Sequence, residues 1–305
     1  MRTSELQKGE SNIGLQDKLY DVAVVGEDNV WCVGYFGAIF HSPDGGSTWI
    51  RKKSGVSEAL LGVSFAGENE GWVVGASGLI LHTTDQGETW EKQDSSVPDQ
   101  KLLKVQFINT QKGWAVGTGG CIIHTVNGGK SWERLPFDQD VILNDVHFIN
   151  ENEGWVAGEF ETIIHTVDGG KTWEVQIGDG LGILFGISMR PDGLRGIAVG
   201  TEGVIYFTED GGANWRHART PGDDTLLKVN YYDDVHAIAV GLRGCLTSTA
   251  DAGQSWTALC LPSHFTWLSG IAFTNGGFGY LVGDAGKILM SKDKGQSWMP
   301  YSLAQ

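Results

Sequence analysis

Seven copies of one short motif, S/T-x-D-x-G-x-x-W, recur along the whole chain at an almost constant interval. Six copies carry Asp at the third position, and the third copy carries Asn127 instead. The closing tryptophans stand at positions 49, 90, 132, 173, 215, 256 and 298, so the interval alternates between 41 and 42 residues. A fixed period of this length indicates a repeat architecture in which each unit packs against the next.

Each copy of the motif has the composition of a tight turn. We expect the Asp or Asn oxygen to accept the backbone N–H two residues on, as in an Asx-turn. The Gly two residues after it supplies a positive φ without steric cost, and the Trp begins a strand and packs its ring into the sheet. We therefore interpret the seven Asp and Asn side chains as structural rather than catalytic.

The rest of each unit predicts three more short strands. In the second unit, 60–65 alternates apolar and small residues, 71–75 reads G-W-x-x-G, and 79–82 is apolar and leads into the motif. Four short strands in a unit of about 40 residues predict an all-β, seven-bladed propeller with four antiparallel strands per blade. The motif then forms the turn between strands 3 and 4.

Residues 19–305 are expected to form this one propeller domain, preceded by an N-terminal segment over 1–18. Two ways of closing the ring are open. The first and last blades can meet without sharing a strand, or residues 5–12 can add an edge strand.

The charge of the chain excludes several classes of partner. The net charge is −15, with 22 Lys and Arg against 37 Asp and Glu. Nucleic-acid binding needs clustered Lys and Arg, so we expect no nucleic acid, whereas basic partners are compatible. No apolar stretch is long enough to cross a bilayer, and the first 18 residues have no hydrophobic signal core. The chain as given is therefore expected to be cytoplasmic and monomeric, without membrane insertion.

The first strand of each blade is expected to line a central channel. Apolar residues such as Val22, Val63 and Val105 should pack inside the blade stack, and their neighbours should face the channel. The polar members of that lining, which together could bind a small ligand, are Asp21, Lys104, Asp145, His147, Lys228 and Asn230.

Loops that break the repeat are the best candidates for a binding site, because a framework position must satisfy the same packing in every blade. Such departures concentrate in blades 6, 7 and 1, on the face opposite the motif turns: Arg243, His264, Phe265, Trp267, Asp284, Tyr35 and Phe36. Aromatic residues with an Arg favour a protein-binding hot spot. A second departure lies in blade 4, where Glu159, Phe160 and Glu161 replace the usual small residues and Gly.

The sequence has neither a catalytic motif nor a cluster of residues at metal-ligand spacing. His41, His82, His124 and His165 precede successive motif turns, but each belongs to a different blade, so we expect framework roles and no metal or cofactor. The chain contains no G-x-S-x-G elbow, P-loop or H-E-x-x-H segment.

The order G-W-x-x-G, G-x-I-x-H-T, D-x-G-x-T/S-W, clear in 71–90 and 154–173, resembles one family. It is similar to the Asp-box (BNR-repeat) propellers of the photosystem II stability and assembly factor group, and the resemblance covers nearly the whole chain. It implies a non-catalytic factor that binds a membrane-protein subunit during assembly, in or outside photosynthesis. It also implies export to a periplasm or thylakoid lumen, as is frequent in the group.

Two enzyme alternatives remain, both with a site at the channel mouth. One is a small-molecule lyase or cyclase, and the other is a glycan-acting enzyme that uses a carboxylate pair such as Glu159 and Glu161.

Overall fold

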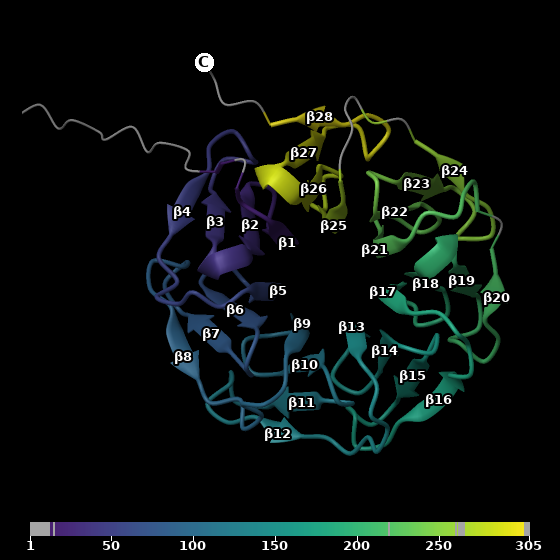
Figure 1. The fold of residues 1–305 in the computed structure, drawn as a ribbon, viewed down its shortest axis with the longest axis horizontal. Helices are drawn as coiled ribbons and strands as arrows, with labels where there is room; N and C mark the ends of the chain where they lie inside the picture. The colour runs from purple at the N-terminus through teal and green to yellow at the C-terminus, as the bar shows by residue number, and fades with distance from the viewer. Residues whose placement is uncertain (1–12, 15, 219, 260, 262–265, 302–305) are drawn as a thin grey trace, which may run out of the picture.

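A computed structural model describes residues 13–14, 16–218, 220–259, 261 and 266–301. These residues form a ring of seven four-stranded sheets around a central axis (Figure 1). Within each sheet, strands consecutive in sequence pair as antiparallel neighbours. The predicted seven-bladed all-β propeller is confirmed.

The strands follow one another in chain order, four to a blade. Blades 1 to 4 are β1 (Leu19–Val25), β2 (Asn29–Gly34), β3 (Ile39–Ser42), β4 (Ile50–Lys52); β5 (Leu60–Ala66), β6 (Glu70–Gly75), β7 (Ile80–Thr83), β8 (Glu91–Gln93); β9 (Leu102–Phe107), β10 (Gly113–Gly117), β11 (Ile122–Thr125), β12 (Glu133–Arg134); and β13 (Leu143–Phe148), β14 (Gly154–Gly158), β15 (Ile163–Thr166), β16 (Glu174–Ile177). Blades 5 to 7 are β17 (Leu184–Met189), β18 (Gly196–Gly200), β19 (Ile205–Thr208), β20 (Arg216–His217); β21 (Leu226–Tyr231), β22 (Ala237–Gly241), β23 (Leu246–Thr249), β24 (Thr257–Ala258); and β25 (Leu268–Phe273), β26 (Gly279–Gly283), β27 (Ile288–Ser291), β28 (Met299–Pro300). Short 3₁₀ turns η1 (Tyr35–Gly37), η2 (Thr201–Gly203) and η3 (Asp284–Gly286) join the second and third strands of blades 1, 5 and 7.

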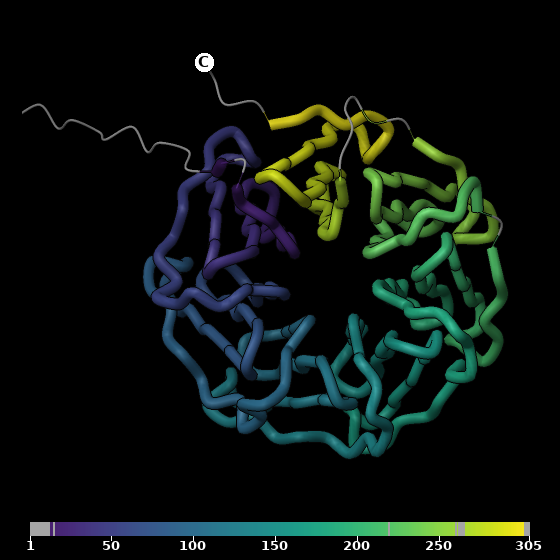
Figure 2. The backbone as a smooth tube through the Cα atoms, in the orientation of Figure 1, coloured from purple at the N-terminus to yellow at the C-terminus, as the bar shows by residue number. Residues whose placement is uncertain are grey.

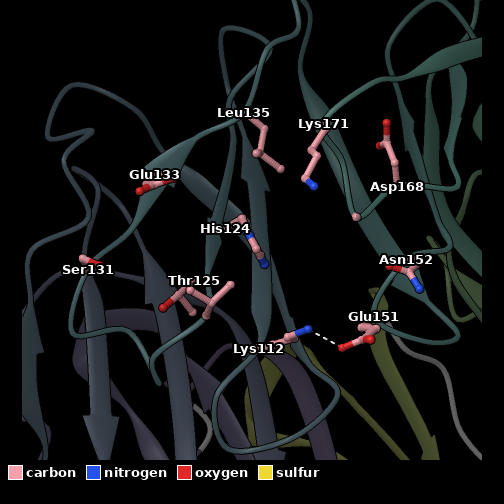
Figure 3. A pocket seen from close by; sticks show the side chains of 12 residues that line it. Lys112, His124, Thr125, Ser131, Glu133, Leu135, Glu151, Asn152, Asp168 and Lys171 are labelled. Carbon is pink, nitrogen blue, oxygen red and sulfur yellow. Dashed lines mark hydrogen bonds and ion pairs between the residues drawn. The ribbon is translucent and has the colours of Figure 1, made fainter.

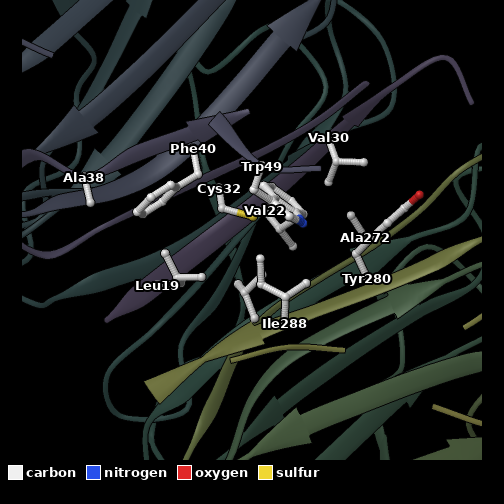
Figure 4. Close-up of a cluster of buried hydrophobic side chains, with 11 residues drawn as sticks. Leu19, Val22, Val30, Cys32, Ala38, Phe40, Trp49, Ala272, Tyr280 and Ile288 are labelled. Atoms are coloured by element: carbon white, nitrogen blue, oxygen red, sulfur yellow. The ribbon is translucent and has the colours of Figure 1, made fainter. Parts of the chain in front are cut away.

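The ring closes by packing of blade 7 directly against blade 1, which lie side by side in Figure 2. One buried cluster contains Leu19, Val22 and Trp49 from blade 1 together with Tyr280 and Ile288 from blade 7 (Figure 4). The Ser269 hydroxyl donates to the Leu19 carbonyl at 2.9 Å across the same junction. Blade 7 is complete with its own four strands, and the alternative edge strand over 5–12 lies outside the described residues.

The turn between the third and fourth strands, here called the box turn, has a hydrogen-bond pattern that differs from our prediction. In blade 1, Asp44 Oδ1 accepts the N–H of Thr48 at 2.7 Å, four residues on rather than two. The N–H two residues on, that of Gly46, donates to the Ser42 hydroxyl at 2.7 Å. That hydroxyl is held in place because it donates to Asp44 Oδ1 at 2.9 Å. The expected positive φ is present, at 86° for Gly46.

The box turn of blade 4 supports a prediction with an internal control. Asp168 accepts hydrogen bonds from the Thr166 hydroxyl and from the N–H and hydroxyl of Thr172, at 2.7–2.9 Å. In blade 3 Asn127 accepts the equivalent N–H of Ser131 at 3.0 Å and donates to its hydroxyl at 2.9 Å. Asp168→Ala should therefore lower the free energy of unfolding by about 1–3 kcal/mol, and Asp168→Asn by much less. Urea unfolding measures both, and equal losses would contradict this role for the side chain.

Candidate functional site

The turns between second and third strands share one face with the connections between blades, opposite the box turns. Most of these turns are hydrogen-bonded to the connection that follows their blade: the N–H of Gly37 donates to the Glu58 carbonyl at 2.9 Å, and that of Gly78 to the Gln100 carbonyl at 2.6 Å. In blade 7 the N–H of Gly286 donates to the Asp17 carbonyl at 2.7 Å. No blade follows blade 7 in the chain, so the segment before blade 1 occupies the place that a connection between blades has elsewhere. Variable residues near the two ends of the chain therefore lie close together at this junction.

The structure brings most of the repeat-breaking residues of blades 6, 7 and 1 close to one another. The Trp267 ring is stacked on the Tyr20 ring, with centroids 5.7 Å apart and an interplanar angle of 10°. The N–H of Asp284 donates to the Trp267 carbonyl at 3.3 Å, and that of Arg243 to the Thr266 carbonyl at 2.8 Å. We call Tyr20, Tyr35, Phe36, Arg243, Trp267 and Asp284 the seam patch.

The aromatic side chains of the seam patch differ in exposure. Tyr35 is 52% and Phe36 is 62% exposed, whereas Trp267 is half-buried against Tyr20. Burial, Tyr35 and Asp284 together raise the pKa of Tyr20, so the three side chains are electrostatic neighbours. Exposed rings beside a supported Trp are the composition of a protein-docking surface.

Two details of the seam patch were not anticipated from the sequence. Arg243 is not free, because its guanidinium forms an ion pair with Asp224. Tyr20, which supports Trp267, was missed, although its position in the first strand is variable among blades and is occupied by Leu61, Asn144 or Ser269 elsewhere. The predicted residues His264 and Phe265 lie outside the described residues.

A groove of about 870 Å³ lies beside Phe36, between blades 1 and 2. Its lining includes Arg51, Lys52, Lys53 and Lys92, which form a basic surface on an otherwise acidic protein. Arg51 pairs with Asp17 at 3.3 Å, Lys52 with Glu88 at 2.6 Å and Lys92 with Glu58 at 3.8 Å. The basic charge of the groove is therefore largely balanced by carboxylates of the same chain.

The blade 4 turn is separated from the seam patch by the width of the ring (Figure 1). Phe160 is 53% exposed there. Glu159 accepts the N–H of Ile142 at 2.8 Å, and Glu161 accepts the N–H of Gly182 at 3.2 Å and the Tyr206 hydroxyl at 2.5 Å. Both carboxylates, considered above as a catalytic pair, thus have structural hydrogen bonds.

The central channel contains a cavity of about 340 Å³ lined by residues that include Lys104, Asp145, His147, Lys228 and Asn230. Its charged groups form two ion pairs, here called clasps. In each clasp the lysine and the aspartate come from the two blades on either side of a third blade. Lys104 Nζ donates to Asp21 Oδ2 at 2.6 Å, and Lys228 Nζ donates to Asp145 Oδ1 at 2.8 Å. Asp21 is only 3% exposed and is not part of the cavity lining.

The clasps are possible because the intervening blades carry Gly62 and Gly186 at the equivalent position. A Cβ on either glycine would lie 3.0 Å from the Cα of the clasping lysine, Lys104 or Lys228. The same aspartates also accept N–H groups of the next blade, since Val63 donates to Asp21 at 3.0 Å and Ile187 to Asp145 at 2.9 Å. Most of the charged side chains in the channel therefore form hydrogen bonds between blades.

The apolar residues expected inside the blade stack are almost fully buried; Val22 and Ile271, for example, are each 4% exposed. They nevertheless border the channel cavity along with the polar side chains. His147 and Asn230 face the cavity without a hydrogen-bond partner among the described residues. A small ligand in the channel stays a prediction that rests on these two side chains.

The four histidines before the box turns stack on the tryptophan of the second strand in their own blades. The ring centroids are 3.9 Å apart for Trp31 and His41, and 4.9 Å for Trp114 and His124. In blades 1 and 4 the imidazole also contacts an acceptor, Asn29 at 3.1 Å and Glu153 at 3.3 Å.

In blade 3 the equivalent acceptor position holds Lys112, which pairs with Glu151 instead. The two side chains border a pocket of about 360 Å³ into which His124 points (Figure 3). Burial, with Lys112 next, lowers the pKa of His124. Among the described residues no group of three His, Cys, Asp or Glu is arranged to hold a metal ion. In the same part of the chain no helix is long and apolar enough to cross a membrane.

Comparison with solved structures shows the same fold in several proteins. YCF48 bound to D1 peptide is 23% identical, with a TM-score of 0.73 over 90% of this chain and 91% of that chain. YCF48 from Cyanidioschyzon merolae is 20% identical, with a TM-score of 0.74 over 92% and 96%. The GH74 xyloglucanase from Xanthomonas campestris is 12% identical, with a TM-score of 0.77, and the match covers 96% of this chain but 55% of the enzyme.

The family comparison covers almost the whole chain. No curated protein sequence matches the chain. The family model described as photosynthesis system II assembly factor YCF48 matches residues 3–98, 93–219 and 214–305. With its seven matching blades, the chain therefore belongs to the YCF48 photosystem II assembly factor family.

Proposed function

We propose that this protein is a non-catalytic, protein-binding propeller that holds a segment of a partner protein on the face opposite the box turns, at the seam patch. The observation that carries the proposal is the exposed pair Tyr35 and Phe36 beside the Trp267–Tyr20 stack, where both ends of the ring meet. Membership of an assembly factor family supports it, as does the solved structure of a YCF48 bound to D1 peptide. A membrane-protein subunit in the course of assembly is the partner class that this relationship favours.

The geometry of the seam patch suits an extended segment. Tyr35 and Phe36 supply apolar contact area, and the adjoining groove of about 870 Å³ offers space along the Arg51–Lys53 edge. The Arg243 guanidinium, exposed and paired with Asp224, can exchange that carboxylate for one on the partner. Binding would then combine aromatic anchors with a directional charged contact at the rim.

The proposal predicts that Phe36→Ala, and separately Trp267→Ala with Arg243→Ala, weaken partner binding by about 2 kcal/mol or more, roughly 30-fold in Kd. Phe36→Ala should leave the fold intact, because Ala285 occupies the same turn position of blade 7 with φ 56°, against 55° for Phe36. Phe278→Ala is the matched control, since Phe278 is 40% exposed but lies between β25 and β26 on the box-turn face.

The measurement has two steps. Affinity capture from the native host identifies partners that the wild type retains and the Phe36→Ala protein loses. The purified partner is then titrated against each variant whose thermal unfolding matches that of the wild type. An unchanged Kd in both seam variants would place the site elsewhere, and turnover of a small molecule by the purified chain would favour the enzyme alternatives.

A further inference from the structure

A second exposed apolar surface lies on the same face at blade 4. Phe160 is 53% exposed and Leu181, in the connection to blade 5, is fully exposed. The two belong to one unit, because the N–H of Gly180 donates to the Phe160 carbonyl at 3.0 Å and the N–H of Glu161 donates to the Gly182 carbonyl at 3.0 Å. We call Phe160 and Leu181, with the carboxylates of Glu159, Glu161, Asp179 and Glu202, the blade 4 platform.

The backbone that presents Phe160 is held in an uncommon conformation. Phe160 has φ 58° and Glu161 has φ 54°, both in the left-handed region that costs a side chain conformational energy. The position of Glu161 is occupied by Gly in the other six blades, for example Gly37 and Gly203. Here the Glu161 side chain compensates by accepting the Gly182 N–H and the Tyr206 hydroxyl. A positive φ at the Phe160 position is shared by other blades, as at Phe36 and Ala285, so it is Glu161 with its two side-chain contacts that sets the blade 4 turn apart.

The charged side chains that belong to the platform are all carboxylates. Among the described residues, none of Glu159, Glu161, Asp179 and Glu202 takes part in an ion pair. Glu202 lies next to the platform because the N–H of Thr201 donates to the Ile183 carbonyl at 3.0 Å, and Asp179 acts electrostatically on Tyr206, as Glu161 does. The basic side chains of the blade 1 groove are, in contrast, mostly paired within the chain.

We propose that the blade 4 platform docks a cationic segment of a partner protein, rich in Lys or Arg, that places a bulky apolar side chain against Phe160 and Leu181. The proposal rests on the proposed function in that the chain is taken as a protein-binding module. Charge complementarity selects the occupant: a basic segment gains the unpaired carboxylates as partners, whereas an acidic segment is repelled.

The test is a fluorescence anisotropy titration with a short labelled peptide of alternating Lys and Leu. The wild type should bind it, and Phe160→Ala with Leu181→Ala should raise Kd about tenfold or more. Asp179→Asn with Glu202→Gln should also raise Kd and reduce its dependence on salt, because fewer charges then attract the peptide. Neither the Asp179 nor the Glu202 side chain makes a hydrogen bond in the described part of the chain, so the fold should be unaffected by this second variant.

Controls separate this site from the seam patch. Phe278→Ala, and Trp267→Ala with Arg243→Ala, should leave the Kd of the Lys–Leu peptide unchanged, and a Glu–Leu peptide should not bind. An unchanged Kd in either platform variant, or equal binding of the Glu–Leu peptide, would overturn the inference. Loss of peptide binding only in the seam variant would also overturn it, while leaving the proposed function intact. Loss of the host partner in the seam variants, with the peptide still bound, supports both proposals.

Discussion

Replacing Asp145 by Ala is expected to lower the free energy of unfolding by about 3–5 kcal/mol, the range found when one partner of a buried ion pair is removed. Asp145 is 2% exposed and accepts both the Lys228 ammonium at 2.8 Å and the Ile187 N–H at 2.9 Å. The variant leaves Lys228 and a backbone donor without their acceptor inside the ring. Equilibrium unfolding in urea gives the value directly.

A double variant shows whether the unpaired buried charge causes this loss of stability. Asp145→Leu with Lys228→Met removes both charges and keeps similar volume, so most of the lost stability should return. Lys228→Met alone should destabilise like Asp145→Ala, since it leaves the carboxylate unpaired. If the double variant is as unstable as either single one, packing rather than charge pairing explains the loss. Asp21 and Lys104 offer an independent repetition of the same cycle.

The second large expected effect is a loss of stability in mild acid caused by His147. Burial, with Asp145 opposing it and Lys228 and Lys104 adding to it, lowers the pKa of His147 from 6.5 to about 4. Between these values the unfolded chain binds a proton that the folded chain excludes, so the free energy of unfolding falls as the pH falls. The full difference is on the order of 3 kcal/mol, reached near pH 4.

This prediction is checked by urea unfolding at several pH values between 7 and 5. His147→Asn, which places at this channel position the residue that blade 6 has at Asn230, should flatten the dependence of stability on pH. His41, whose pKa is also lowered to about 4 by burial and by Lys52, should continue to contribute in that variant. The same slope in wild type and variant would show that the folded chain protonates His147 readily.

Features that depend on contacts within one blade could be predicted from the sequence. The box turns are an example, because the hydroxyl, carboxylate and Gly that shape a turn such as 42–49 lie within a few residues of one another. The hydrogen-bond partner in the turn was wrong by two residues, since the Ser or Thr hydroxyl competes with the Asp for the nearer N–H.

Features that depend on contacts between blades were not accessible in this way. The position of Trp267 marked it as variable, but its stack on Tyr20 joins residues from opposite ends of the chain. The repeat pattern also placed Lys104 and Asp21 in the channel lining. It did not indicate that they form an ion pair, because Lys104 lies in blade 3 and Asp21 in blade 1, with blade 2 between them.

The sequence by itself determined the number of blades, their strand order and the face on which the variable loops lie, because each of these follows from short-range geometry repeated seven times. The tertiary structure alone decided which side chains pair across the channel and which gather at the seam and at blade 4. Closing the ring sets those distances, and a glycine in one blade, such as Gly62, determines whether side chains of its two neighbours can meet.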